Sequence, residues 1–417
     1  MNSIHVTFLI LIFAVVMFVT ELIPMTATAL SVPLLFYVFG ILDAKQVFAG
    51  FVDENLIMFI GMFVIGRSIL VSGLAEKLGK KILSKLHTEQ GLLAAVMVTA
   101  MFLSMFLNNT GTVALLIPII CGICEASEIS PSKFMMPLAF AASLGGMCTL
   151  IGTPPNLIVK SVMEETSGGY VGLFEFAKFG VPLCIFGLCY FLLISRKSKA
   201  LNNGKEAVMP AKEDSEKFSL KNQIISGSVF VIVVALMLTE KQTGIPMCIS
   251  STVGALALVV AGVMSEKQAF DAIEMNTVFL MGGMFSVSKA LAVTGAGELV
   301  AQKLAGAASK GGAVGFVMLL FLVSMLITQF MSNSAAAALF VPLSANIASL
   351  TGFDIKTILM VVALGSSCAF MTPIATPPNT MVMSYGGYEF RDYMKVGIPF
   401  SAICAVCVCV CLIVMKV

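Results

Sequence analysis

The chain carries one short motif twice, and the residues in it are suited to binding small ions. Residues 151–156 read Ile-Gly-Thr-Pro-Pro-Asn, and residues 374–379 read Ile-Ala-Thr-Pro-Pro-Asn, 223 positions later. Each copy lies in an apolar stretch and follows a polar cluster, Asn-Asn-Thr at 108–110 and Ser-Asn-Ser at 332–334. Paired, proline-interrupted apolar segments at matching places in two halves indicate the binding site of a secondary transporter.

Proline explains why these motifs could bind ligands. It has no amide hydrogen and disfavours helical backbone at the preceding residue, so each motif must interrupt its helix. An interrupted helix leaves carbonyl oxygens that suit a small cation, and it begins a second helix whose N-terminus suits an anion. Two such breaks, each with amide and hydroxyl oxygens nearby, are expected to enclose one anion flanked by cations. The alternative, a purely structural kink, is less favoured because the whole arrangement occurs twice.

The composition sets the class of protein that must position these breaks. Hydrophobic residues make up 58% of the chain and charged residues 12%, against about 25% charged in soluble domains. Apolar runs near the roughly 20 residues that cross a bilayer follow one another along the chain. We therefore expect an all-α polytopic membrane protein in contact with the lipid bilayer. A net charge of +2 suggests no nucleic-acid partner, and two histidines and a lone Cys121–Cys124 pair suggest no cofactor or metal cluster.

The repeat extends beyond the proline motifs. Residues 23–25 match 245–247, and residues 45–48 match 267–270, at nearly constant spacing. We predict two repeats joined by a linker, with these bounds: residues 1–194 (hairpin about 90–126, broken helix about 134–166), linker 195–222, and residues 223–417 (hairpin about 313–350, broken helix about 356–384). The linker is polar and basic, so we expect it to be solvated.

Each repeat is predicted to hold five transmembrane helices and one re-entrant hairpin. The hairpin arms, about 16 apolar residues each, are short for a full crossing, and a polar tip is tolerated when it is buried in protein. The remaining predicted spans are 5–21, 25–42, 55–73 and 176–194, then 223–239, 247–264, 275–293 and 395–416. Because five is odd, the repeats must have inverted topology. The excess of Lys and Arg on one side places the linker in the cytoplasm and both termini outside the cell membrane.

Three stretches together resemble a known family. They are residues 20–24 (Thr-Glu-Leu-Ile-Pro), residues 143–146 (Ser-Leu-Gly-Gly) running on to the first proline motif, and residues 367–371 (Ser-Cys-Ala-Phe-Met) running into the second. In these the chain resembles the divalent anion/sodium symporter family, carriers of dicarboxylates, citrate or sulfate. The resemblance covers nearly the whole chain. The family has two Ser-Asn-Thr hairpin tips, whereas this chain has Asn108 in place of the first Ser and Ser334 in place of the last Thr.

The resemblance implies two sodium sites and one substrate site, position by position. The first sodium site would use Ser104, Asn108, Asn109 and the Gly152 carbonyl, and the second Thr328, Met331, Asn333 and Ala375. Substrate carboxylates would meet Asn109, Thr110, Thr153, Asn333, Ser334, Thr376 and Pro377. The amide of Asn108 is longer than a serine hydroxyl and adds an NH₂ donor, which alters the first sodium site. Ser334 lacks only a methyl group, so its role should be kept. The resemblance also implies a homodimer.

These observations predict a sodium-coupled symporter of a small divalent anion, a C4 or C5 dicarboxylate, working by alternating access. The part carrying both hairpins and both broken helices would rock or slide against the other helices. A sodium-independent dicarboxylate exchanger and a carrier of sulfate or another oxyanion remain alternatives. From another class come a channel and a cation/proton antiporter, although the motifs contain no titratable carboxylate for an antiporter. An enzyme is not expected, since the sequence shows no nucleophile–base pair.

Overall fold

All regular elements of the protein are helices within the residues that the computed structural model describes: 3–83, 88–127, 129–167, 169–195, 201, 218–351 and 354–415. Seven segments in these ranges are long and apolar enough to cross a membrane: α1 (Ser3–Thr20), Ala44–Val71, α7 (Asn109–Ser127), α10 (Ala177–Ile194), α12 (Leu220–Leu238), α16 (Met275–Thr294) and α21 (Phe390–Val414). The prediction of an all-α polytopic membrane protein is therefore confirmed.

Two predicted spans end earlier than the sequence suggested. α2 (Met25–Val38) and α14 (Met247–Val260) have 14 residues each, a rise of about 21 Å where roughly 30 Å is needed to cross the hydrocarbon core. Each ends at a glycine with positive φ, Gly40 at +69° and Gly262 at +71°. Only glycine adopts this conformation readily, so it ends the helix although apolar residues continue beyond it.

Short helices that the sequence analysis did not predict connect the long ones. α3 (Ala44–Phe48) and α15 (Glu266–Asp271) both begin with a capping box, Asp43 with Gln46 and Ser265 with Gln268. These boxes satisfy backbone amides at the helix start in the repeated Lys-Gln stretches. The other short elements are η1 (Ala49–Val52), α5 (Leu74–Leu83) and α13 (Glu240–Thr243). η1 leads directly into α4 (Glu54–Val71).

Four helix pairs carry the polar clusters and the proline motifs. They are α6 (Glu89–Ser104) with α7, α8 (Ser132–Gly146) with α9 (Pro154–Ser167), α17 (Ala296–Ile327) with α18 (Asn333–Thr351), and α19 (Ile355–Ser367) with α20 (Pro377–Gly386). The proline motifs lie between α8 and α9 and between α19 and α20, where the chain leaves helical geometry. α17 bends at Gly312, so only its last part forms the hairpin arm.

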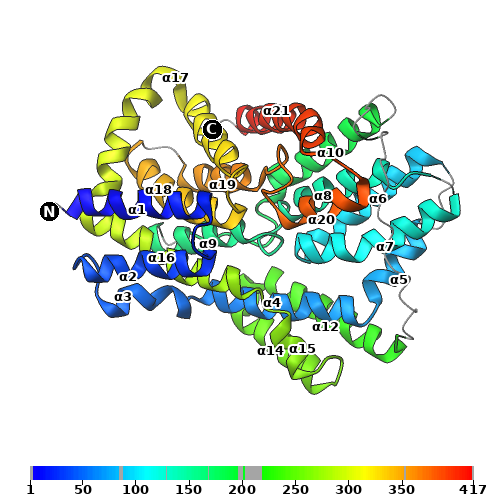
Figure 1. The fold of residues 1–417 in the computed structure, drawn as a ribbon. Coiled ribbons are helices and arrows are strands. Elements are labelled where there is room, and N and C mark those ends of the chain that lie inside the picture. The colour runs from blue at the N-terminus through cyan, green and yellow to red at the C-terminus, as the bar shows by residue number, and fades with distance from the viewer. Residues whose placement is uncertain are drawn as a thin grey trace.

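The pairs are arranged so that each broken helix contacts both hairpins. Figure 1 shows α8, α9, α19 and α20 in the middle, with α6 and α7 towards one end and α17 and α18 towards the other. α6 packs on α8, and α17 packs on α19. α9 then crosses to pack on α18, while α20 packs on α7 and α8. The two breaks are thereby brought to the same region between the hairpins.

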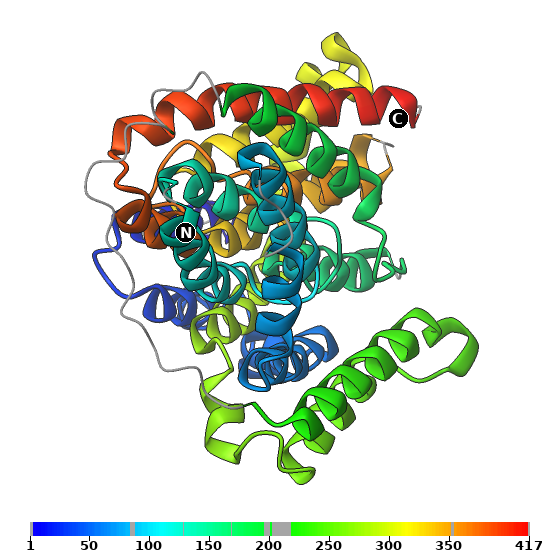
Figure 2. The ribbon, with the colours of Figure 1, turned by 90° about the vertical axis from the view of Figure 1, so that its right-hand side faces the viewer.

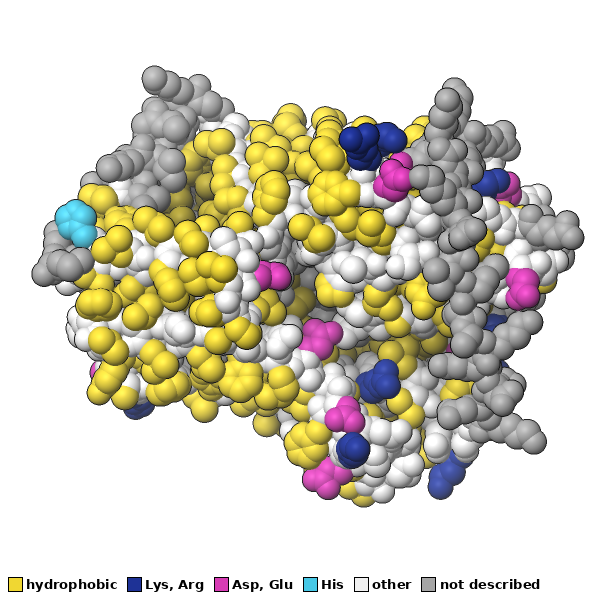
Figure 3. Space-filling model, viewed as in Figure 1, with side chains coloured by type: hydrophobic (Ala, Val, Ile, Leu, Met, Phe, Trp, Pro, Cys, Tyr) yellow, Lys and Arg dark blue, Asp and Glu magenta, His cyan; other side chains and the backbone are white. Residues whose placement is uncertain are grey.

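The outer helices present apolar side chains. α12 and α14 pack together and against α4, and they project from the rest of the molecule in Figure 2. Their outer residues include Val231, Leu256 and Val260, which are 63%, 62% and 79% exposed. In Figure 3 apolar side chains cover much of the visible face, most densely on its left-hand side, and charged side chains are scattered over the middle, the upper edge and the lower and right-hand parts. Such a surface suits a lipid environment.

Candidate functional site

Oxygen atoms from three elements converge at the first hairpin tip. Ser104, the last residue of α6, donates from its hydroxyl to the amide oxygen of Asn109, the first residue of α7, at 2.6 Å. Gly146 closes the cluster from α8: a Cβ there would lie 2.6 Å from the Asn109 Oδ1 and 3.1 Å from the Gly152 carbonyl oxygen. The structure thus brings together Ser104, Asn109 and Gly152, three of the four residues implied as the first sodium site. Hydroxyl, amide and carbonyl oxygens suit a hard cation.

The fourth implied ligand, Asn108, is engaged by other partners. Its Oδ1 accepts from the Gly111 amide at 2.7 Å, which satisfies one of the free amides at the start of α7. Its Nδ2 donates to Oε1 of Glu274, just before α16, at 2.6 Å. Each polar atom of the side chain therefore makes one hydrogen bond, and the amide oxygen contacts the start of α7 rather than the Ser104 hydroxyl.

The second hairpin tip repeats the first with different side chains. The Thr328 hydroxyl lies 2.9 Å from the Asn333 Oδ1 and 2.6 Å from the Ser366 carbonyl oxygen. One hydroxyl hydrogen can satisfy only one of these acceptors at a time, so the three oxygens together would suit a cation. Met331, in the turn between α17 and α18, and Ala375, in the second break, are both buried. Their apolar side chains leave only their carbonyl groups as ligands.

The asparagines that end the two proline motifs hold the breaks in shape. Asn156 donates from Nδ2 to the carbonyl oxygens of Gly146 and Thr149, and Asn379 donates in the same way to Ala369 and Thr372. Both side chains are fully buried, and the Oδ1 of each makes no hydrogen bond within the described residues. Buried polar groups without partners are rare, so these two oxygens are available to a bound ion or water.

A threonine hydroxyl forms a hydrogen bond between each break and the neighbouring hairpin. The Thr149 hydroxyl donates to the Met105 carbonyl, and the Thr372 hydroxyl donates to the Gln329 carbonyl at 2.9 Å. In the second half the Gln329 side chain adds three further bonds. Its Nε2 donates to the carbonyls of Met325 and Cys368, and its Oε1 accepts from the Met371 amide at 2.8 Å.

The residues implied as substrate ligands lie on the helix ends around these clusters. Thr153 and Thr376 directly precede α9 and α20, and both are buried. The Thr376 hydroxyl makes no hydrogen bond within the described part of the chain. Thr110 and Ser334 are the second residues of α7 and α18 and are half-buried. Among the residues implied as substrate ligands, Pro377 is exposed.

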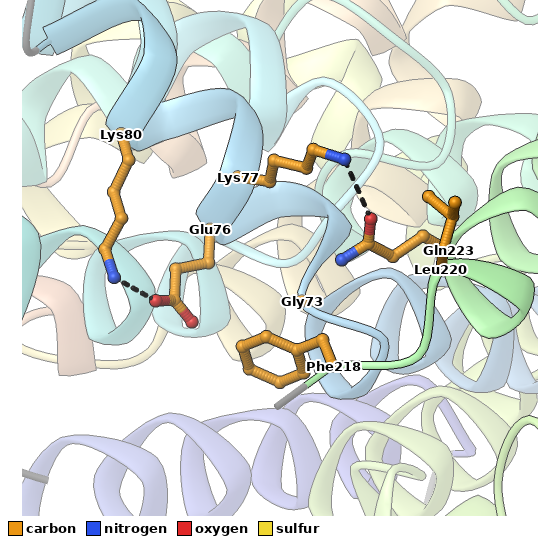
Figure 4. Close-up of a pocket in the computed structure, with 7 residues that line it drawn as sticks. All are labelled: Gly73, Glu76, Lys77, Lys80, Phe218, Leu220 and Gln223. Carbon is orange, nitrogen blue, oxygen red and sulfur yellow. Dashed lines mark hydrogen bonds and ion pairs between the residues drawn. The ribbon is translucent and has the colours of Figure 1, made fainter. Parts of the chain in front are cut away.

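A cavity of about 380 Å³ lies elsewhere, between α5 and α12 (Figure 4). In it Lys80 pairs with Glu76 at 2.5 Å, and Lys77 donates to Gln223 at 3.3 Å. Phe218 covers Gly73 at its floor. No residue of the two hairpin tips lines this cavity, and its walls combine charged side chains with open surface. This cavity is therefore separate from the residues that the resemblance implies as ligands.

Several residues of the site could not be singled out from the sequence. Asn156 and Asn379 stood in the repeated motif but had no role assigned, although their burial in an apolar stretch was a signal. Gln329 carried a weaker signal, as a polar residue in an apolar arm close to Asn333. Glu274 carried none, because it lies 166 residues from its partner Asn108.

Comparison with known proteins identifies the family of this chain. The family described as citrate transporter matches residues 15–357 and again residues 234–416. The chain belongs to the citrate transporter family. This family consists of transporters and not enzymes, and the membership confirms the resemblance to ion transporters noted in the sequence. A member of the family is a multi-pass membrane protein, in agreement with the seven candidate spans.

Related proteins match this member of the citrate transporter family over nearly its whole length. A protein of Haemophilus influenzae named as an uncharacterized transporter is 28% identical over 95% of this chain and 88% of its own length. The sodium-dependent dicarboxylate transporter SdcS of Staphylococcus saprophyticus is 24% identical over 91% of this chain and 80% of its own. The crystal structure of the YdaH transporter of Alcanivorax borkumensis shares the fold, with a TM-score of 0.67 at 16% identity over 97% of both chains.

Proposed function

We propose that this protein is a sodium-coupled symporter of a small divalent anion, a C4 or C5 dicarboxylate. One observation carries the proposal: two clusters of neutral oxygen ligands, Ser104–Asn109 and Thr328–Asn333, lie beside the two breaks that precede α9 and α20. Residues 104–110, 151–156, 328–334 and 374–379 contain no Lys or Arg. The similarity to SdcS, a sodium-dependent dicarboxylate transporter, supports the same substrate class.

Charge balance gives the mechanism of coupling. A dianion at this site would meet only hydroxyls, amides and the N-termini of two helices, which together offer partial positive charge. Bound sodium at the hairpin tips would supply the remaining charge, so each ligand would raise the affinity for the other. Uptake of the anion would then follow the inward sodium gradient.

The arrangement of helices supports inverted repeats with re-entrant hairpins. The long helices of 3–194 and 220–414 occur in the same order, and the hydrogen bonds that shape the tips and the breaks occur in both halves. The helix α7 is by itself long enough to cross a membrane. However, the tip between α6 and α7 contacts the middle of the broken helix, where the Thr149 hydroxyl donates to the Met105 carbonyl. A tip at that depth would not reach the far surface. Alternating access would move both hairpins and both broken helices against a framework that dimerises, with the linker in the cytoplasm.

The test is uptake of radiolabelled succinate into proteoliposomes, with and without an inward sodium gradient and with sulfate as competitor. We expect sodium-driven accumulation that excess unlabelled dicarboxylate blocks and sulfate does not. Asn109→Ala and Asn333→Ala should each abolish uptake without unfolding the protein, while Asn222→Ala, on α12, should leave it unchanged. Full sodium-dependent uptake by both hairpin variants would refute the assignment of the site.

A sodium-independent exchanger of dicarboxylates is the second candidate function. The observation that favours it is the use of both polar atoms of Asn108 by Gly111 and Glu274, which leaves fewer ligands for a cation at the first tip. An exchanger would move succinate only when the vesicles contain dicarboxylate, whatever the sodium gradient. Uptake of sulfate but not succinate would instead indicate an oxyanion carrier.

A further inference from the structure

One carboxylate reaches the first hairpin tip. Glu274 directly precedes α16 and accepts a hydrogen bond from the Asn108 Nδ2 at 2.6 Å. Its second oxygen accepts from the Thr277 hydroxyl at 3.3 Å. Both partners are neutral, and within the described ranges no Lys or Arg forms an ion pair with Glu274. A carboxyl group therefore lies against Asn108, the residue next to the Ser104–Asn109 cluster.

The position of Glu274 has a simpler explanation, which is that an acidic residue stabilises the start of a helix. That explanation covers the position of Glu274 before α16, where the partial positive charge of the helix offsets part of its own. It does not cover the contact with Asn108, which comes from a different part of the chain. The Glu274 side chain also caps no backbone amide of α16. Its closest hydrogen bond is to the hairpin tip and not to its own helix.

Among the described residues, no carboxylate is hydrogen-bonded to the second tip. Ser332 occupies the position of Asn108 there, and its hydroxyl accepts from the Ala335 amide just as Asn108 accepts from Gly111. The Ser332 hydroxyl also donates to the sulfur of Met25, the first residue of α2, at 3.3 Å. The two tips thus share the helix-capping bond and differ in what lies across from it. A carboxylate faces one tip and a thioether faces the other.

We propose that Glu274 is a determinant of ion coupling: its negative charge favours cation binding at the Ser104–Asn109–Gly152 cluster and opposes binding of the dianion until that cation is present. Opposite charges attract and like charges repel most strongly where protein partly excludes water. An unpaired carboxylate next to the site would therefore order the binding events, cation first and anion second. The inference rests on the proposed symport, and it deepens that proposal by naming the group that imposes the order.

The same interaction gives a chemical reason for Asn108. A serine hydroxyl could cap α7 as Ser332 caps α18, but it has only one hydrogen to donate. The amide of Asn108 accepts from Gly111 with its oxygen and donates to Glu274 with its nitrogen at the same time. Asn108 therefore positions the carboxylate beside the tip while preserving the helix start.

The decisive variant is Glu274→Gln, which keeps an oxygen for Asn108 and removes the charge. Succinate uptake into proteoliposomes would be measured as a function of external sodium and of succinate. We expect the sodium concentration for half-maximal uptake to rise about tenfold, the effect of roughly 1.4 kcal/mol. At saturating sodium, the KM for succinate should fall and the maximal rate should stay within about twofold of the wild type. Glu266→Gln, the same change on exposed α15, is the matched control.

Two further variants separate charge from hydrogen bonding. Glu274→Ala removes both, and the pair Asn108→Ser with Glu274→Met reproduces the uncharged arrangement of the second tip. If charge is what matters, all three variants share the raised sodium requirement. If Glu274 only supports the fold, Glu274→Gln behaves as wild type, and Glu274→Ala loses maximal rate at every sodium concentration without a change in half-saturation. That second pattern would overturn the inference while leaving symport intact.

A transport-independent readout distinguishes failure of the inference from failure of the proposed function. The melting temperature of the purified protein would be recorded against NaCl, with KCl at equal ionic strength. Sodium-specific stabilisation that moves to higher concentration in Glu274→Gln supports the inference even if succinate is the wrong anion. Stabilisation with the same sodium dependence in both proteins refutes it. If neither sodium-specific stabilisation nor sodium-driven uptake occurs in the wild type, both proposals are wrong.

Discussion

The two hairpin tips and their breaks share one set of supporting bonds and differ in the side chains around them. In both, a hydroxyl contacts the amide of the hairpin Asn, a threonine of the break bonds the hairpin turn, and the motif Asn bonds two carbonyls of the break. The differences are Gly146 against Ala369, Met105 against Gln329, and Glu274 against Met25 as partner across the tip. The bonds that shape the backbone are kept, and the groups that set rigidity and charge have diverged.

The largest effect is expected where the first site is most crowded. In Gly146→Ala the new Cβ would lie 2.6 Å from the Asn109 Oδ1, so the amide must move away from Ser104 and Gly152. We expect sodium-driven uptake to fall by a factor of about 100 or more, because ligand geometry this close cannot relax without loss. The reverse change at the second site, Ala369→Gly, should cost less than about tenfold. Equal losses in the two variants would show that the sites are built alike.

Gln329→Met makes the second half resemble the first. Gln329 is buried and makes three side-chain hydrogen bonds, and its loss would leave the Cys368 carbonyl and the Met371 amide without those partners. We expect the free energy of unfolding to fall by about 2–4 kcal/mol, since each buried unsatisfied group costs about 1–3 kcal/mol. Thermal unfolding in detergent measures this. Met105→Leu, the matched change in the first half, should cost under about 1.5 kcal/mol.

The two motif asparagines should behave alike. Asn156→Ala and Asn379→Ala each remove two hydrogen bonds to carbonyls of a break, from side chains that are equally buried. We expect each to lower the unfolding free energy by about 1–3 kcal/mol and to reduce uptake to a similar degree. The comparison would be wrong if one variant lost activity and the other did not, because that would give one Asn a direct role in ligand binding.

The smallest effect concerns a contact that only the first half makes among the described residues. The buried Ser161 hydroxyl of α9 donates to Oδ1 of Asp53, which caps α4, at 3.2 Å. Ser161→Ala should lower the unfolding free energy by about 0.5–1.5 kcal/mol and leave the sodium dependence of uptake unchanged. Ser384→Ala, on the exposed face of α20, should have no measurable effect. A shift in sodium half-saturation for Ser161→Ala would show that this contact takes part in coupling.

Features of the fold and the site that depend on neighbouring residues could be predicted from the sequence, whereas contacts between residues far apart in the chain could not. The breaks followed from proline alone, and the hairpins followed from polar residues inside apolar runs. The ends of α2 and α14 were misplaced because a glycine turn overrode apolar composition. Asn108 was noticed as an unusual residue, but its partner Glu274 could not be, because no local pattern connects residues 166 positions apart. Gln329 was missed because its bonds join a hairpin arm to a separate loop.

The buried amides of Asn156 and Asn379 have a consequence for where movement can occur. A loop held by two such hydrogen bonds has already lost its conformational entropy during folding. Binding of the proposed ligands at the breaks would then have little ordering left to oppose it, so more of the interaction energy would remain for affinity. The breaks are therefore poor hinges. In the alternating-access cycle proposed above, flexing would take place in the connections between the four helix pairs and the other helices, with the breaks carried along as preformed parts.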